Sequence, residues 1–274
     1  MLDSNDLLID LLPEIRRIAK QAGEKIMEVY EKGFEIEIKK DNSPVTTADL
    51  AANEVIEREL NALSLLFPIL SEESAEIPFE KRSARETYWL IDPLDGTKEF
   101  IKRRDSFTVN IALIHKNKSI LGVVYAPALD VSYFACRGHG SFKQTADDPE
   151  YQIKARALPK VPMIAGSRSH LGKTLEAYLK NLKDDKGDYE LISMGSSLKM
   201  CLVAEGVADL YPRLWLTSEW DTAAAHCIVD EAGGCLVKTD MSPLLYNTKD
   251  SLLNPFFFTI GNNDCDWTQY LPSS

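Results

Sequence analysis

Residues 89–100 read WLIDPLDGTKEF, and this stretch decides both the expected fold and the expected site. Its first three residues are apolar and predict a buried strand, and Asp92 and Asp95 follow directly. Pro93 fixes its own φ angle and Gly96 tolerates backbone angles closed to other residues, so we expect the two carboxylates to lie in a rigid loop after the strand. Carboxylates held in this way suit Mg²⁺. Taken alone, the fragment also fits an ordinary turn, because Asp, Pro and Gly are common turn formers.

The composition is typical of an enzyme-sized globular protein. The chain has 274 residues with 45% apolar content, which suits one large domain or two packed ones. A formal net charge of −11 argues against binding a nucleic-acid polymer. No signal peptide and no stretch of roughly 18 uninterrupted apolar residues is visible. We therefore expect a cytoplasmic protein, monomeric or homodimeric, with peripheral association at the inner face of the membrane as an alternative.

The five cysteines are odd in number and form no C-x-x-C pair. Most of them have apolar neighbours, which indicates reduced core thiols and argues against a disulfide or a zinc site. They are Cys136, Cys201, Cys227, Cys235 and Cys265.

The first half of the chain, residues 1–150, predicts an α+β unit. Apolar residues at three- and four-residue steps from Leu7 to Val29 predict a long amphipathic helix that ends near Gly33. Thr46 and Thr47 would cap a second helix and place Asp49 in its first turn. Strands are expected at residues 34–38, 67–70, 88–91, 107–114, 120–125 and 131–135, with residues 116–118 as a hairpin turn.

The polar stretch at residues 144–150 predicts a boundary, so residues 151–274 are expected to form a second, α/β domain. Strands alternate there with helices, and they are expected at residues 161–165, 190–192, 208–211, 235–238 and 256–260. The fold class is therefore α/β (α+β), with two layered units that share a cleft.

Five acidic residues are expected at the ends of helices and strands. They are Asp49, Glu72, Asp92, Asp95 and Asp221. Each one alone has a structural explanation as a surface acid, a turn residue or a helix cap. If they converge, however, their charges require cations to compensate them.

A site with two or three Mg²⁺ ions beside Gly96 and Thr97 suits phosphoryl transfer. Metal ions activate a water and neutralise phosphate oxygens, and backbone N–H groups at Gly96 and Thr97 would point at the phosphate. Thr97 is expected to pass a proton from the attacking water to Asp49. The four histidines are scattered and no Ser-His-Asp motif is visible, so a covalent mechanism has little support.

Residues 89–100, and residues 220–224 followed by 231–234, resemble the two signature motifs of the inositol monophosphatase superfamily. The likeness extends to residues 41–49 and 70–73 and covers nearly the whole chain. It implies a lithium-sensitive, Mg²⁺-dependent phosphomonoesterase with the layered αβαβα sandwich of the inositol monophosphatase and sugar phosphatase type.

Four further stretches resemble one branch of that superfamily, the bacterial CysQ-type 3′(2′),5′-bisphosphate nucleotidases. They are residues 98–101, 166–170, 195–199 and 211–213. This likeness implies hydrolysis of adenosine 3′,5′-bisphosphate to AMP and phosphate, with 3′-phosphoadenylyl sulfate as a further substrate, in sulfur assimilation or nucleotide recycling. The alternatives are a phosphatase of inositol phosphates or fructose 1,6-bisphosphate, and a catalytically silent sensor of metal or nucleotide.

The resemblance also implies roles for individual residues. The implied metal ligands are Glu72, Asp92, Asp95 and Asp221 with the backbone carbonyl of Leu94; the implied catalytic residues are Asp49, Thr97 and Glu72; Gly96 and Thr97 would bind the phosphate; and His170, Ser196, Lys199 and Arg213 would bind the substrate. Cationic partners suit a second phosphate, although Lys199 and Arg213 also fit a solvated surface. Residues 215–219 depart from the family pattern and leave substrate contacts there open.

Overall fold

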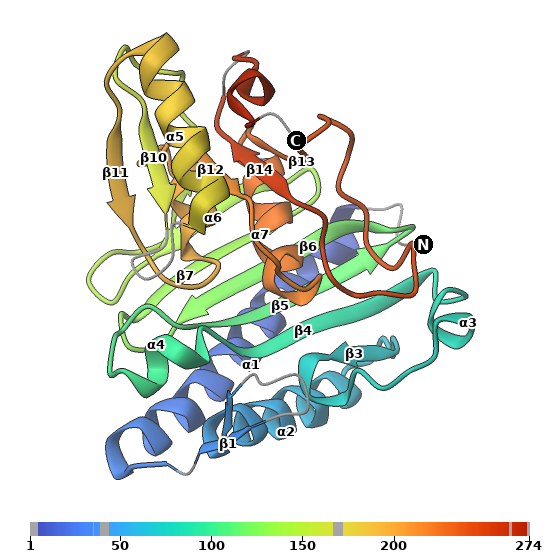
Figure 1. Ribbon diagram of the computed structural model, residues 1–274. Helices are drawn as coiled ribbons and strands as arrows, with labels where there is room; N and C mark the ends of the chain where they lie inside the picture. The colour runs from blue at the N-terminus through green and yellow to red at the C-terminus, as the bar shows by residue number, and fades with distance from the viewer. Residues whose placement is uncertain (1–4, 35, 39–43, 167–171, 263–264, 273–274) are drawn as a thin grey trace.

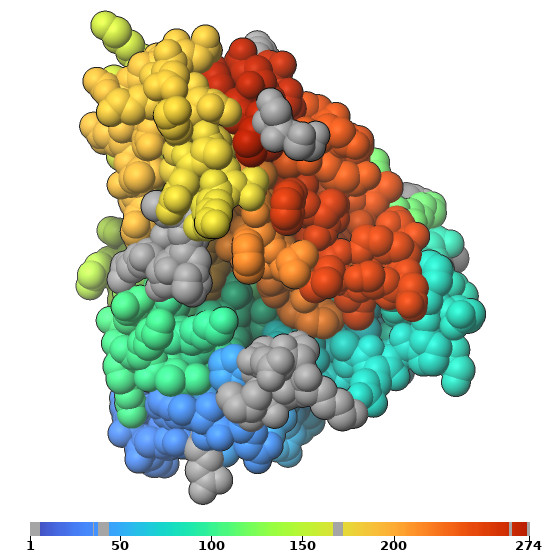
Figure 2. All heavy atoms as spheres, in the orientation of Figure 1, coloured from blue at the N-terminus to red at the C-terminus, as the bar shows by residue number. Residues whose placement is uncertain are grey.

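The computed structural model describes residues 5–34, 36–38, 44–166, 172–262 and 265–272. Within them the chain forms a seven-stranded sheet, a five-stranded sheet and a small two-stranded sheet. The two large sheets alternate with layers of helices (Figure 1). In the space-filling view, drawn in the orientation of Figure 1, the N-terminal part of the chain lies at the bottom of the molecule and the C-terminal part at the top (Figure 2).

The seven-stranded sheet has the order β3-β4-β5-β6-β7-β8-β9. Only β3 and β4 run parallel, and the rest form an antiparallel meander. The predicted hairpin turn between β5 and β6 is confirmed, with positive φ angles at Lys116 and Asn117. The strands are β3 Ile69–Ser71, β4 Thr87–Asp95, β5 Thr108–His115, β6 Lys118–Ala126, β7 Val131–Cys136, β8 Gly140–Gln144 and β9 Tyr151–Ile153.

Two long helices cover one face of this sheet, α1 (Asn5–Lys32) and α2 (Thr47–Asn61). Alternate strand residues such as Trp89 and Ile91 point to them, and the intervening Tyr88 and Leu90 point to the opposite face. Since helices lie on both faces, the central strands are continuously apolar instead of alternating. The small sheet, β1 (Ile36–Ile38) with β2 (Pro44–Thr46), precedes α2.

The opposite face of the seven-stranded sheet packs against α6 (Leu198–Ala204) and α7 (Trp220–Glu231). Helix α7 approaches β6 so closely that a Cβ atom at Gly122 would lie 2.1 Å from the carbonyl oxygen of Ala224. A side chain at position 122 would therefore push α7 away from the sheet.

The five-stranded sheet has the order β11-β10-β12-β14-β13. One face covers α6 and α7, and the other carries α5 (Gly172–Lys186) and the 3₁₀ helix η2 (Trp267–Tyr270). The strands are β10 Met163–Gly166, β11 Glu190–Ser193, β12 Leu210–Arg213, β13 Cys235–Lys238 and β14 Phe257–Ile260. The three cores between these layers confirm the αβαβα sandwich.

Short helices complete the chain, namely η1 Glu72–Ser74, α3 Phe79–Arg82 and α4 Thr97–Ile101. Strand β9 begins directly after the boundary expected at residue 150 but belongs to the seven-stranded sheet, and one core joins the two large sheets, so the division into two domains stays a prediction. In the described part of the chain, every helix is too short or too polar to cross a bilayer. All five cysteines lie in that part and none forms a disulfide; Cys136, Cys201 and Cys227 are buried, as the sequence predicted.

Candidate active site

Asp92 and Asp95 lie within β4, where the sequence predicted a loop. Asp92 pairs with Asn110 of β5 and Asp95 pairs with Thr108, so two residues of β4 lie opposite one of β5. This extra residue is a β-bulge, and Pro93 fits there because a bulge leaves backbone groups out of the ladder. Asp92 and Asp95 are three residues apart, so in a regular strand their side chains would point to opposite faces of the sheet. The bulge adds one residue between them and turns both side chains to the face that packs against α6 and α7. The prediction of a loop was therefore wrong, because residues 92–95 belong to strand β4, although the two acids do lie on the same face.

Three of the predicted metal ligands converge. Glu72, Asp92 and Asp221 each contribute one carboxylate oxygen, and these oxygens lie within 4.8 Å of one another. Strand β3 runs parallel to β4, so their carboxyl ends meet at one edge of the sheet and bring Glu72 beside Asp92. Asp221 arrives from the opposite layer in the first turn of α7.

The electrostatics of this cluster call for a cation. Burial and the neighbouring carboxylates raise the pKa of Asp92 well above its usual range, with Glu72 the largest of those neighbours. Burial also raises the pKa of Asp221, and repulsion by Asp95 and Glu72 adds to the shift. Oxygen donors that repel one another and are partly shielded from water fit a hard divalent cation such as Mg²⁺.

Asp95 sits beside the cluster and is held by protein groups. One of its oxygens accepts hydrogen bonds from the Ser197 N–H at 2.6 Å and from the Asn110 amide at 3.4 Å. The Ser197 hydroxyl bonds Asn110 at 2.8 Å and Thr108 at 2.9 Å. Burial raises the pKa of Asp95, while Lys199 and the Ser197 bond oppose that rise.

Thr108 and Asn110 contact the site although the sequence motifs predicted no role for them, and Ser197, expected within residues 195–199 to hold a phosphate, binds Asp95 instead. A signal was available, because Thr108 and Asn110, with His115 at the other end, are the polar residues of the otherwise apolar strand β5, and all three are buried. A buried amide needs a hydrogen-bonding partner, so its presence in such a strand indicates a polar neighbour across the sheet face.

Asp49 and Thr97 are hydrogen-bonded to each other. The Thr97 hydroxyl donates to Asp49 Oδ1 at 3.2 Å, and it also lies 3.3 Å from the Leu94 carbonyl oxygen. Asp49 Oδ2 accepts from the Thr46 N–H and hydroxyl, each at 2.7 Å, which completes the capping box of α2. Burial raises the pKa of Asp49, and the Thr46 bonds partly offset that shift. Gly96 has a φ of 93°, which lets the chain turn from β4 into α4 and carry Thr97 back toward Asp49.

A cavity of about 310 Å³ connects the acidic cluster to the predicted substrate residues. Asp95, Gly96 and Asp221 line it, and so do the predicted substrate residues Ser196, Lys199 and Arg213. Its size lies at the lower end of the range for small-molecule sites. The fourth predicted substrate residue, His170, lies outside the described residues.

Lys199 is not the solvated charge that its position also allowed. Its side chain is only 6% exposed, and its ammonium group donates to the Ser196 carbonyl at 2.7 Å and lies 5.5 Å from the centre of the Tyr211 ring. Burial lowers the pKa of Lys199 to about 8, although Asp95 opposes that shift. Arg213 is the last residue of β12, and its guanidinium donates to the Leu216 carbonyl at 2.9 Å.

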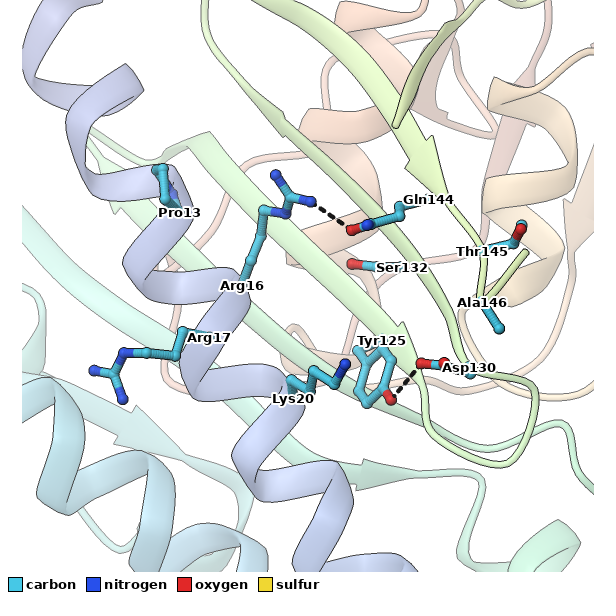
Figure 3. A pocket seen from close by; sticks show the side chains of 10 residues that line it. All are labelled: Pro13, Arg16, Arg17, Lys20, Tyr125, Asp130, Ser132, Gln144, Thr145 and Ala146. Atoms are coloured by element: carbon cyan, nitrogen blue, oxygen red, sulfur yellow. Dashed lines mark hydrogen bonds between the residues drawn. The ribbon is translucent and has the colours of Figure 1, made fainter. Parts of the chain in front are cut away.

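A larger cavity, of about 450 Å³, lies between α1 and strands β6 to β8 (Figure 3). Most of its charges are already paired, since Arg16 bonds Gln144 and Glu150, and Asp130 accepts from the Tyr125 hydroxyl. None of the predicted site residues lines it. We therefore place the chemistry in the smaller cavity.

A cluster of carboxylates between two sheets of an αβαβα sandwich defines a family of metal-dependent phosphatases. The chain belongs to the inositol monophosphatase family, which matches residues 10–262. The resemblance drawn from the sequence motifs is thereby confirmed.

Proteins similar to this chain in sequence point to one branch of the family. The 3′(2′),5′-bisphosphate nucleotidase CysQ of Escherichia coli (strain K12) is 46% identical over 249 residues, which cover 90% of this chain and 98% of that protein. The nucleotidase of the same name from Haemophilus influenzae is 39% identical and covers 94% of this chain and 95% of its own. The crystal structure of CysQ from Bacteroides thetaiotaomicron superimposes with a TM-score of 0.78 at 41% identity, covering 90% of this chain and 95% of that one.

Proposed function

We propose that this protein is a Mg²⁺-dependent 3′(2′),5′-bisphosphate nucleotidase, which hydrolyses adenosine 3′,5′-bisphosphate to AMP and phosphate. The similar proteins that carry this name support the proposal, because the match covers almost all of both chains. One structural observation carries it. One cavity is lined by two acids of the candidate metal site, Asp95 and Asp221, and by the cations Lys199 and Arg213, with Lys98 also on its wall. An acidic cluster alone would suit any phosphatase of the family, whereas two cations in the same cavity suit a substrate with a second phosphate.

Glu72, Asp92 and Asp221 would hold Mg²⁺, with Asp95 and the Leu94 carbonyl beside them. When bound there, Mg²⁺ supplies positive charge to the phosphate oxygens and lowers the pKa of the attacking water. The protein provides a proton acceptor of its own. The Thr97 hydroxyl, already bonded to Asp49 Oδ1, can take a proton from water while it gives its own to Asp49.

The non-reacting phosphate would lie between Lys199 and Arg213. Both residues face the cavity from the C-terminal half of the chain, whereas Thr97 and most of the acids come from the N-terminal half. The substrate would therefore bridge the layers, with the ester to be cleaved on the acids and the second phosphate on the cations. Ser196 lines the cavity between them and could donate its hydroxyl.

The test compares two substrates in two variants. Lys199→Met and Arg213→Leu should each weaken kcat/KM for adenosine 3′,5′-bisphosphate by about 1.5–3 kcal/mol, the usual range for a charge-assisted hydrogen bond. Inositol 1-phosphate has no second phosphate, so its hydrolysis should change little. Equal losses on both substrates, or a wild-type preference for inositol 1-phosphate, would instead favour an inositol phosphatase.

The proposal also covers the ion, a further substrate, the location and the oligomeric state. Mg²⁺ is the proposed ion, with inhibition by Li⁺ competing for a weakly held position. 3′-Phosphoadenylyl sulfate is a further proposed substrate, since it keeps the 3′-phosphate ester. A cytoplasmic location, with or without contact to the inner face of the membrane, and a monomeric or homodimeric state complete the proposal.

A further inference from the structure

The cavity has an apolar edge as well as its charged residues. Trp215 and Leu216 line it, and they are 67% and 55% exposed. Single exposed apolar side chains are common on proteins and need no explanation. Here, however, two adjacent large ones border the cavity that holds Asp95 and Arg213. Both lie in the segment 215–219 that departs from the family pattern.

The segment that carries Trp215 is fixed on both sides. Leu214 is buried in the core between the five-stranded sheet and α5. The Arg213 guanidinium donates to the Leu216 carbonyl at 2.9 Å, and the Asn254 N–H donates to the Thr217 carbonyl at 2.7 Å. The indole is therefore exposed on a held backbone, so that binding a ligand to it costs little ordering of the chain.

The charged residues already account for the other parts of a nucleoside bisphosphate. The acids suit the reacting phosphate, and Lys199 with Arg213 suits the second phosphate. What remains is the base, which is flat, aromatic and largely apolar on its faces. An indole that borders the same cavity is the side chain best suited to stack on it.

We propose that Trp215, flanked by Leu216, is the stacking platform for the base and a specificity-determining residue of this enzyme. This inference rests on the proposed nucleotidase function and adds to it. Stacking responds to aromatic area, so this platform should favour purine over pyrimidine nucleotides.

The experiment measures kcat/KM of the wild-type protein and of Trp215→Ala and Trp215→Phe on three substrates. These are adenosine 3′,5′-bisphosphate, uridine 3′,5′-bisphosphate and methyl ribofuranoside 3,5-bisphosphate, which keeps both phosphates and lacks a base. Trp215→Ala should lower kcat/KM for the adenosine substrate about 10-fold, the usual order for one lost stack, mainly through KM. The uridine substrate should lose less and the base-free substrate nothing. Trp215→Phe should keep most of the wild-type activity.

Leu66→Ala is the matched control, because Leu66 is equally exposed at 69% and does not line the cavity. It should change none of the three rates. An equal loss on all three substrates in Trp215→Ala, or no loss on any, would overturn the stacking role while leaving the nucleotidase function in place. A wild-type protein that hydrolyses neither nucleotide would overturn the proposed function itself.

Discussion

Asp95 differs from the other acids of the site because protein groups already hold one of its oxygens. The Ser197 N–H and the Asn110 amide bind that oxygen, and Ser197 in turn is held by Thr108. The carboxylate is thus oriented before any ion arrives, at the cost of keeping a negative charge beside Asp92 and Asp221. A residue held in this way can be changed without disturbing the core, which makes it the best single probe of the metal site.

Asp95→Asn should lower kcat by more than about 100-fold while leaving the fold intact. The amide oxygen can still accept from Ser197, so circular dichroism and the melting temperature should change little. The measurement is phosphate release at saturating Mg²⁺. Activity near that of the wild type would show that Asp95 has no part in the metal site.

Thr97 and Asp49 should behave as one unit. Thr97→Ala and Asp49→Asn should each lower kcat by roughly 10²–10⁴-fold, the usual contribution of a positioned proton acceptor, with little change in KM. The double variant should be no slower than the worse single variant. If the two losses instead multiplied, the residues would act independently and the proton relay would be wrong. Thermal melts of each variant should accompany the kinetics, because Asp49 also caps α2.

Lys199 should give the reaction an alkaline limit. Burial disfavours the charged ammonium and lowers its pKa to about 8, so the charge that attracts the second phosphate disappears as the pH rises through that value. The kcat/KM for adenosine 3′,5′-bisphosphate should therefore fall above about pH 8, while that for inositol 1-phosphate should not share this limit. Identical alkaline limbs for the two substrates would assign the limit to another group.

At the scale of elements, α7 links the packing of the sandwich to the site. Its first turn carries Asp221, and the next residues Ala223 and Ala224 lie directly on β6. Small side chains on the helix and Gly122 on the strand allow this close approach. The position of Asp221 therefore depends on the packing of Ala223 and Ala224, which follow it in the same helix.

Gly122→Ala should destabilise the protein by about 1–3 kcal/mol or more, because the new methyl group meets the Ala224 carbonyl. The same shift of α7 should also lower kcat. Urea unfolding measures the first effect and phosphate release the second. Gly166→Ala is the matched control, since no residue that the structure describes lies within 4 Å of a Cβ atom there. A neutral Gly122→Ala would mean that α7 can move without cost.

The sequence predicted most elements correctly, because their signals are local. Helix α1 shows its apolar period from Leu7 to Val29, and β5 and β6 are long apolar runs joined by a tight turn. The bulge in β4 has no such signal. It exists because β5 continues to pair beside it, and the sequence of residues 92–95 alone reads as a turn.

At the scale of the whole molecule, the order of the strands within each sheet could not be predicted from the sequence. In the five-stranded sheet, β12 pairs with β10 and β14, so it contacts neither β11 nor β13, its two neighbours among the strands of the chain. Such pairings depend on which apolar faces fit together across α6 and α7, and composition does not encode that choice. The acids could be assigned because the family motifs mark them, whereas the sequence signal at Asn110 did not name its partner, and its hydrogen bond with Ser197 across the two halves is visible only in the fold.

The acidic cluster should couple metal binding to the stability of the whole sandwich. Without a cation, Glu72, Asp92 and Asp221 repel one another between the two large sheets, so the fold loses free energy there. Mg²⁺ at about 100 times its dissociation constant should raise the free energy of unfolding by about 2.7 kcal/mol, and chelation should remove that gain. Thermal melting with and without Mg²⁺ measures it independently of activity.

Asp92→Asn separates repulsion from metal binding, because it removes one buried charge and keeps the shape of the side chain. It should raise the melting temperature of the metal-free protein and abolish most of the increase that Mg²⁺ gives to the wild type. Asp147→Asn removes an exposed acid outside the cluster and should change neither value. A metal-free Asp92→Asn protein that melts below the wild type would show that repulsion among these carboxylates does not limit stability. An undiminished response to Mg²⁺ would mean that the ion stabilises the protein at another place.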